Sequence, residues 1–183
     1  MLKHALFSLL TFAAFTAPVP AFAGKKSFII DGGLFRSFDP VRVDNGVDLD
    51  KGGITKFGVN FIVPKGYIKN SPIKLQVRLS VDETNCSTVF RPGHVYRNRP
   101  GFKQLISVAG LSASEPDVFE VPSSVGKVFT RSFTLTKTGA GTIPDQRAGD
   151  HLYITFGREV FETEDTCMLR LKATSMKVIY SVN

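Results

Sequence analysis

The segment Arg91–Lys103, RPGHVYRNRPGFK, concentrates basic and aromatic side chains. A guanidinium group can donate two parallel hydrogen bonds to a sulfate, phosphate or carboxylate group, and an aromatic ring offers a face on which a sugar ring can stack. The segment therefore predicts a site for an anionic ligand, formed by Arg91, His94, Tyr96, Arg97, Arg99 and Lys103. The alternative is structural. Pro92-Gly93 and Pro100-Gly101 would each turn the chain, and a short edge strand between them would carry its charges as a guard against aggregation.

A second candidate site lies in the acidic residues that precede the two cysteines, Cys86 and Cys167. A disulfide between these cysteines would bring the two acidic segments together. Crowded carboxylate oxygens are the ligands that Ca²⁺ prefers. The sequence thus predicts a calcium site formed by Asp82, Glu83, Glu162, Glu164 and Asp165. Two solvated acidic loops that bind no ion are the alternative, and no other cofactor is expected.

Catalytic chemistry has few residues to work with. After the first 23 residues the only histidines are His94 and His151, and the chain contains no G-x-S-x-G, H-E-x-x-H or P-loop motif. A glycan hydrolase with paired carboxylates would have to use Glu162, Glu164 or Asp165. Such an enzyme needs one carboxyl group whose pKa is raised in a cleft, and loops at a rim provide no cleft. We therefore expect no enzymatic activity and predict no catalytic residue.

The N-terminal residues predict a secretory signal peptide. Lys3 and His4 form a basic start, an apolar stretch runs to Phe15, and Ala21-Phe22-Ala23 is an A-x-A cleavage site. The expected products are a leader of residues 1–23 and a mature chain that starts at Gly24. The protein is therefore expected to be secreted or periplasmic, and the mature chain has no apolar run long enough to span a membrane.

The net charge of the chain is +7, and removing Lys3 with the leader leaves about +6. A basic exported protein is attracted to anionic surfaces such as acidic glycans and envelope polymers. Nucleic acid is not an expected partner, because the chain is expected to be exported. Export also favours a disulfide between Cys86 and Cys167. Closing a loop of about 80 residues would stabilise the fold by on the order of 4 kcal/mol.

Alternation of apolar and polar residues predicts β-strands. It is clear over Ile54–Val63, Ile73–Val81, Val128–Thr136 and Leu152–Phe156, and Met168–Tyr180 can form two short strands or one bent strand. Turns rich in Gly, Pro and Asn separate these segments. We therefore expect an all-β protein with one domain over residues 24–183, an antiparallel β-sandwich of about eight strands, most consistent with a jelly roll.

Two segments carry a family resemblance. VNFIVPKGYIKNSPIKLQVRLSV and AGDHLYITFGRE, with the following CMLRLKATSMKVIY, are similar to the two halves of small jelly-roll domains. Such domains occur in viral and phage structural proteins and in exported bacterial proteins. The resemblance is architectural and implies no active site.

These features predict an exported, non-enzymatic β-sandwich. It would act as a binding or structural module of a cell envelope, appendage or secretion assembly, with a protein partner or another copy of itself. The alternative is a lectin-like module that binds an anionic glycan or cell-surface polymer. A glycan hydrolase is the third possibility considered.

Overall fold

The computed structural model describes residues 24–37, 45–51, 56–101, 106–108, 118–135 and 146–183. The predicted leader, residues 1–23, lies outside them. Eleven strands and one short 3₁₀ helix, η1 (Gly32–Leu34), lie in this part of the chain. Every strand pair is antiparallel. No helix among the described residues is both long and apolar enough to cross a membrane.

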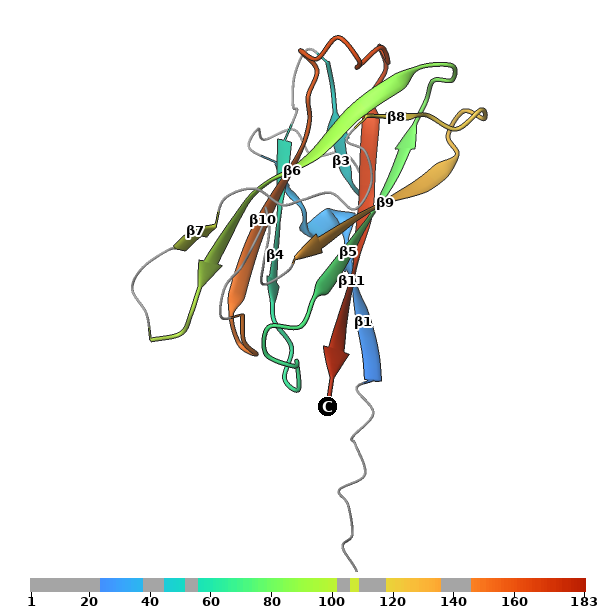
Figure 1. Cartoon of the computed structure of the whole chain (residues 1–183). Helices are drawn as coiled ribbons and strands as arrows, with labels where there is room; N and C mark the ends of the chain where they lie inside the picture. The colour runs from blue at the N-terminus through green and yellow to red at the C-terminus, as the bar shows by residue number, and fades with distance from the viewer. Residues whose placement is uncertain (1–23, 38–44, 52–55, 102–105, 109–117, 136–145) are drawn as a thin grey trace, which may run out of the picture.

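The strands form two sheets packed against each other (Figure 1). Sheet A has the order β1-β11-β5-β9, with β3 also paired to β11. Its strands are β1 (Gly24–Asp31), β3 (Val47–Leu49), β5 (Ile73–Val81), β9 (Val128–Leu135) and β11 (Leu171–Val182). Sheet B has the order β2-β4-β10-β6-β7, with β8 also paired to β6. Its strands are β2 (Arg36–Ser37), β4 (Lys56–Ile62), β6 (Ser87–Asn98), β7 (Ile106–Val108), β8 (Val118–Glu120) and β10 (His151–Arg158).

The strand order is that of a jelly roll. The chain passes back and forth between the sheets, and the last two long strands insert between earlier ones: β10 lies between β4 and β6, and β11 lies between β1 and β5. Two interlocked Greek keys produce this arrangement. The predicted all-β antiparallel sandwich is confirmed. The strand number exceeds the expected eight because short pieces such as β2 and β8 are too brief to show alternation in the sequence.

Aromatic rings fill the space between the sheets. Phe156 of β10 lies at the centre, with ring centroids 5.5 Å from Phe57, 6.0 Å from Phe90 and 5.3 Å from Phe133. All four side chains are at most 1% exposed. Because Phe133 belongs to sheet A and the other three to sheet B, this cluster joins the two sheets.

Strand β6 departs from the prediction at Pro92-Gly93. These residues do not turn the chain, because β6 runs unbroken from Ser87 to Asn98. The pairing of β6 with β10 shifts register here, and Thr155 fills the bulge. The Thr155 hydroxyl oxygen accepts a 2.7 Å hydrogen bond from the His94 N–H. A Cβ at Gly93 would lie 2.4 Å from that oxygen, so only glycine fits. The second turn is as predicted, since Gly101 has a φ of 86°.

Candidate functional site

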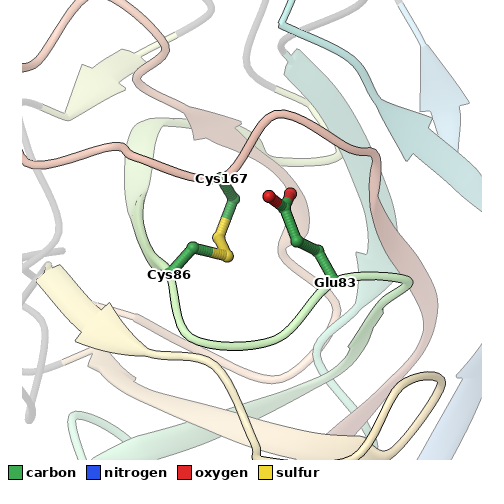
Figure 2. Close-up of side chains that lie close together, drawn as sticks. All are labelled: Glu83, Cys86 and Cys167. Carbon is green, nitrogen blue, oxygen red and sulfur yellow. A yellow bond between two sulfur atoms is a disulfide. The ribbon is translucent and has the colours of Figure 1, made fainter.

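The predicted disulfide is present at one end of the sandwich. Cys86 and Cys167 are bonded, with an S–S distance of 2.07 Å and 5.1 Å between Cα atoms. Cys86 lies just before β6, and Cys167 lies in the connection between β10 and β11. The bond therefore joins two loops that are far apart in the sequence (Figure 2).

Asp165, the acidic residue nearest to Cys167 in the sequence, is buried and does not lie at the rim of the sandwich. Asp165 is 3% exposed and forms a two-pronged ion pair with Arg158, which is 1% exposed. The Arg158 Nε and Nη2 atoms lie 2.9 and 2.7 Å from the two carboxylate oxygens. The Thr88 hydroxyl and the Val89 N–H also donate to this carboxylate, at 2.9 and 3.2 Å. Arg158 in turn donates to the carbonyl oxygens of Leu49, Cys167 and Leu169.

This network decides what Asp165 can do. Burial alone would raise the pKa of Asp165, but hydrogen bonds from Arg158, Val89 and Thr88, together with the charge of Arg158, outweigh it and lower the pKa. A general acid in a glycosidase needs the opposite shift. Asp165 is therefore suited to holding the two loops together, since it stays ionised and fully hydrogen-bonded.

Three of the other predicted calcium ligands have partners of their own. Glu83 accepts hydrogen bonds of 2.7 and 2.8 Å from the N–H groups of Met168 and Leu169. Figure 2 shows the Glu83 carboxylate pointing toward the chain that follows Cys167. Glu162 pairs with Arg91 at 2.9 Å. Glu164 accepts a hydrogen bond from its neighbour Thr163, and Asp82 is exposed.

In the described part of the chain, one group of potential metal ligands is compact. It consists of Glu83, Cys86 and Cys167, whose donor atoms lie within 4.8 Å of one another. Both sulfur atoms of this group are bonded to each other, so neither is the thiolate that binds metals. The structure does not bring the five predicted carboxylates together. Calcium binding at this end stays a prediction, and the geometry adds no support for it.

The arginines of the RPGHVYRNRPGFK segment are largely committed to the fold. Arg99 forms two hydrogen bonds of 2.7 and 3.0 Å to Asp150, whose side chain is 1% exposed. Arg97 is 5% exposed, and Arg91 pairs with Glu162. His94 and Tyr96 do lie together on sheet B, with ring centroids 6.1 Å apart. Lys103 lies outside the described residues.

On the outer face of sheet A, in contrast, basic side chains are exposed to solvent. Along β5, Leu75, Val77 and Leu79 point into the core and are fully buried. Side chains alternate between the two faces of a strand, so Lys74 and Arg78 point outward, and both are exposed. The same alternation exposes Lys177 on β11, between the buried Met176 and Val178. Lys25 is exposed on β1.

The register of the strands places these cations on one patch. Lys177 lies opposite Gln76, which stands between Lys74 and Arg78 on β5. Lys25 lies opposite Ser181 at the same end of the sheet as Lys74. We refer to Lys25, Lys74, Arg78 and Lys177 as the cationic face. The Cα atoms of Lys74 and Arg78 are about 13 Å apart, since the two residues are four positions apart and a strand rises about 3.3 Å per residue.

Two shallow hollows lie on this face. One has a volume of about 410 Å³ and is lined by Arg78 and Lys177 together with Thr130 and Ser175. The other has a volume of about 550 Å³ and is lined by Lys25 and Lys74 together with Thr134 and Ser181. Hydroxyl groups beside the cations can donate further hydrogen bonds to oxyanions. Both hollows therefore combine positive charge with hydrogen-bond donors.

The charges of the cationic face have no partners in the described part of the chain. None of the ion pairs there includes Lys25, Lys74, Arg78 or Lys177. The acidic residue nearest to them in register is Asp31, at the edge of the same face. Like charges held on one surface raise the local concentration of anions.

Sequence reasoning missed this face, although its signal is visible. IKLQVRLSV alternates apolar residues with Lys74, Gln76, Arg78 and Ser80, and its polar positions carry cations but no carboxylate. The contributions of β1 and β11 could not be added, because the order β1-β11-β5 is set by the tertiary fold.

No family model matches the sequence, and no curated protein resembles it significantly. Among solved structures, dimeric latent PorU from Porphyromonas gingivalis is similar, with a TM-score of 0.48 and 10% identity. The match covers 96% of this chain and 14% of that one. A structure of infectious bursal disease virus, Gx strain, has a TM-score of 0.39 and 6% identity, over 97% of this chain and 38% of that one.

The chain thus spans well under two thirds of the length of either structure. We draw no functional conclusion from these likenesses. The jelly-roll resemblance seen in the sequence is supported by the strand order itself.

Proposed function

We propose that this protein is an exported, non-enzymatic β-sandwich that binds an anionic polymer of a cell envelope through its cationic face. One observation carries the proposal: four exposed cations share one sheet face and form no ion pair with a described carboxylate. Export is supported by the basic start, apolar stretch and A-x-A site of residues 1–23. The same face would suit a module of an appendage or secretion assembly.

The chemistry of the face selects the class of ligand. Arg78 can bind a sulfate, phosphate or carboxylate group in a forked geometry, whereas the three lysines act as point charges. The strands hold all four on a rigid, gently twisted surface. Such a surface fits an extended polymer with repeated negative groups better than it fits a small molecule, which needs an enclosed pocket. An acidic glycan or a phosphate-bearing wall polymer has this form.

The absence of enzymatic activity is part of the proposal. The carboxylates considered for a hydrolase are Glu162, Glu164 and Asp165, and two of them are bound to arginines of the fold. The lowered pKa of Asp165 also argues against its use as an acid.

The proposal is tested by retention on immobilised heparin and polygalacturonate, with neutral dextran as a blank. The variant Lys74→Ser/Arg78→Ser/Lys177→Ser should elute at clearly lower salt than the unchanged protein, because fewer ionic contacts hold it to the support and less salt is needed to screen them. Its melting temperature should stay the same, since these side chains are exposed. Comparing sulfated and carboxylated supports identifies the preferred anion.

A matched control removes one arginine and two lysines elsewhere. Arg36, Lys56 and Lys65 are exposed and lie on sheet B or in the turn that follows β4. The variant Arg36→Ser/Lys56→Ser/Lys65→Ser has the same net charge as the first and should keep most of the retention. Equal loss in both variants would mean that net charge alone causes retention, and the proposal would be wrong.

A further inference from the structure

The edge strands of the two sheets differ in length and in the side chains beside them, and therefore in how readily each could pair with a further strand. In sheet B, the outermost described strands β2 and β7 have two and three residues. In sheet A, β9 lies beside Phe119, which packs against Phe129 at 5.2 Å and under the Arg131 guanidinium at 4.4 Å. Strand β1, at the other end of sheet A, likewise has eight residues and pairs with a single strand, β11, and no described strand lies along its outer edge (Figure 1). It differs from β9 in the side chains that it carries.

Apolar side chains accompany this open edge. Ile29 is 70% exposed on the outer face of β1. Phe28, on the opposite face, is only partly buried, although its ring contacts Phe61 and Tyr180 at centroid distances of 6.0 and 6.1 Å. A long strand edge with exposed apolar side chains is a template for pairing with another strand.

The charges on β1 select the geometry of that pairing. Lys25 lies near the start of β1 and Asp31 at its end, on the same face as Ile29. If two copies of β1 pair antiparallel about Phe28, Lys25 lies opposite Asp31 of the second copy, and Ser27 lies opposite Ile29. Parallel pairing in register would instead place Lys25 beside Lys25 and Asp31 beside Asp31, and facing like charges are destabilising.

We infer that two copies of this chain pair through β1 and form a two-fold symmetric dimer. The symmetry makes each favourable contact occur twice and closes the interface, so the β1 edges of both copies are used and no further copy can add through β1. The two Ile29 side chains become diagonal neighbours across the new strand pair, and the two Phe28 side chains lie opposite each other. The partner of this edge is thus a second copy, and sheet A becomes continuous across the dimer.

One consequence rests on the proposed function. The two-fold axis of an antiparallel strand pair in a continuous sheet stands perpendicular to that sheet. Both cationic faces therefore point in the same direction, and a single polymer chain could contact both. Two linked sites of this kind bind more tightly than one, because the second contact is intramolecular.

The dimer is tested by sedimentation equilibrium of the purified chain, with its N-terminus established by mass spectrometry. The unchanged protein should show a concentration-dependent monomer–dimer equilibrium. Lys25→Glu places two pairs of carboxylates opposite each other and should weaken dimerisation on the order of tenfold. Adding Asp31→Asn should restore most of this loss. Asn keeps the hydrogen bond from the Gly33 N–H that Asp31 now accepts at 2.9 Å.

Lys74→Glu is the matched control, since it makes the same charge change on the same face but two strands away from the edge. It should leave dimerisation unchanged. A protein that stays monomeric at millimolar concentration would overturn the inference. Equal weakening by Lys25→Glu and Lys74→Glu, or no recovery with Asp31→Asn, would also overturn it. Polymer retention that depends on Lys74, Arg78 and Lys177 would survive these outcomes, so the two proposals fail separately.

Discussion

Two regions of this molecule carry positive charge in opposite ways. At the disulfide end and along β6, arginines are buried or paired, as with Arg158 and Asp165 or Arg99 and Asp150. On the outer face of sheet A, the cations are exposed and form no ion pair in the described chain. The density of basic residues in a sequence therefore does not locate an anion-binding surface. The availability of those residues does.

The contrast has a physical cause. A guanidinium group has five donors in a planar fork, and it is less strongly hydrated than an ammonium group, so it can be buried when carboxylates and carbonyl oxygens satisfy it. A lysine ammonium is compact and strongly hydrated, so it stays at the surface. Three of the four cations on the open face are lysines, and the buried cation at the disulfide end is an arginine.

Arg158→Ala should have the largest effect on stability. It takes the close, two-pronged counter-ion away from the buried Asp165 carboxylate, leaving Lys51 Nζ at 4.0 Å, and it removes a donor from three carbonyl oxygens. The free energy of unfolding should fall by about 3–5 kcal/mol, as measured by urea denaturation. Replacing both partners, Arg158→Met with Asp165→Leu, should recover part of this loss, since no buried charge remains. A loss below about 1 kcal/mol for Arg158→Ala would contradict the view that the buried arginine stabilises the fold more than the exposed cations do.

Arg99→Ala should have an intermediate effect. It deprives the Asp150 carboxylate of two hydrogen bonds and leaves the Arg147 N–H, at 3.0 Å, as a remaining donor. The expected loss is about 2 kcal/mol, since hydrogen bonds to charged groups are worth about 1.5–3 kcal/mol. Lys177→Ala is the comparison on the open face and should change stability by less than about 0.5 kcal/mol in the same experiment. Equal losses in the two variants would contradict our distinction.

Arg91→Ala should have the smallest effect of the three. The side chains of Arg91 and Glu162 are 39% and 43% exposed. A surface ion pair of this kind contributes about 0–1 kcal/mol, and salt screens it. We expect a loss in this range at low salt that shrinks further in 0.5 M NaCl, measured by thermal melting. A larger loss that is insensitive to salt would mean that Arg91 belongs with the buried arginines.

The fold could be predicted well from the sequence because alternation survives in the long strands. Ile73–Val81 was predicted at the bounds that β5 has. The predicted Met168–Tyr180 segment is one strand, β11, which shifts register between Ala173 and Ser175 and is therefore bent. The expected turn at Pro92-Gly93 is wrong, although a Pro-Gly pair is common in turns. Only the register shift opposite β10 and the approach of Thr155 show that this pair forms a bulge.

The candidate sites were harder to predict because they depend on which residues meet in space. Asp165 is one of three carboxylates in ETEDT, and nothing in that segment shows that it alone reaches Arg158. Similarly, Arg99 meets Asp150 only because β6 and β10 are paired neighbours. The disulfide was predictable, since only two cysteines are present and export was expected.

The disulfide has a consequence for how the protein would respond to proteolysis. Cys86 and Cys167 are 81 positions apart, and the chain between them includes β6 through β10. A single peptide bond cut anywhere in that span would leave both fragments covalently joined. The nicked protein would run as one band on a non-reducing gel and as two after reduction. Sheet A would also keep β5 and β11, its central strands, tethered beside each other.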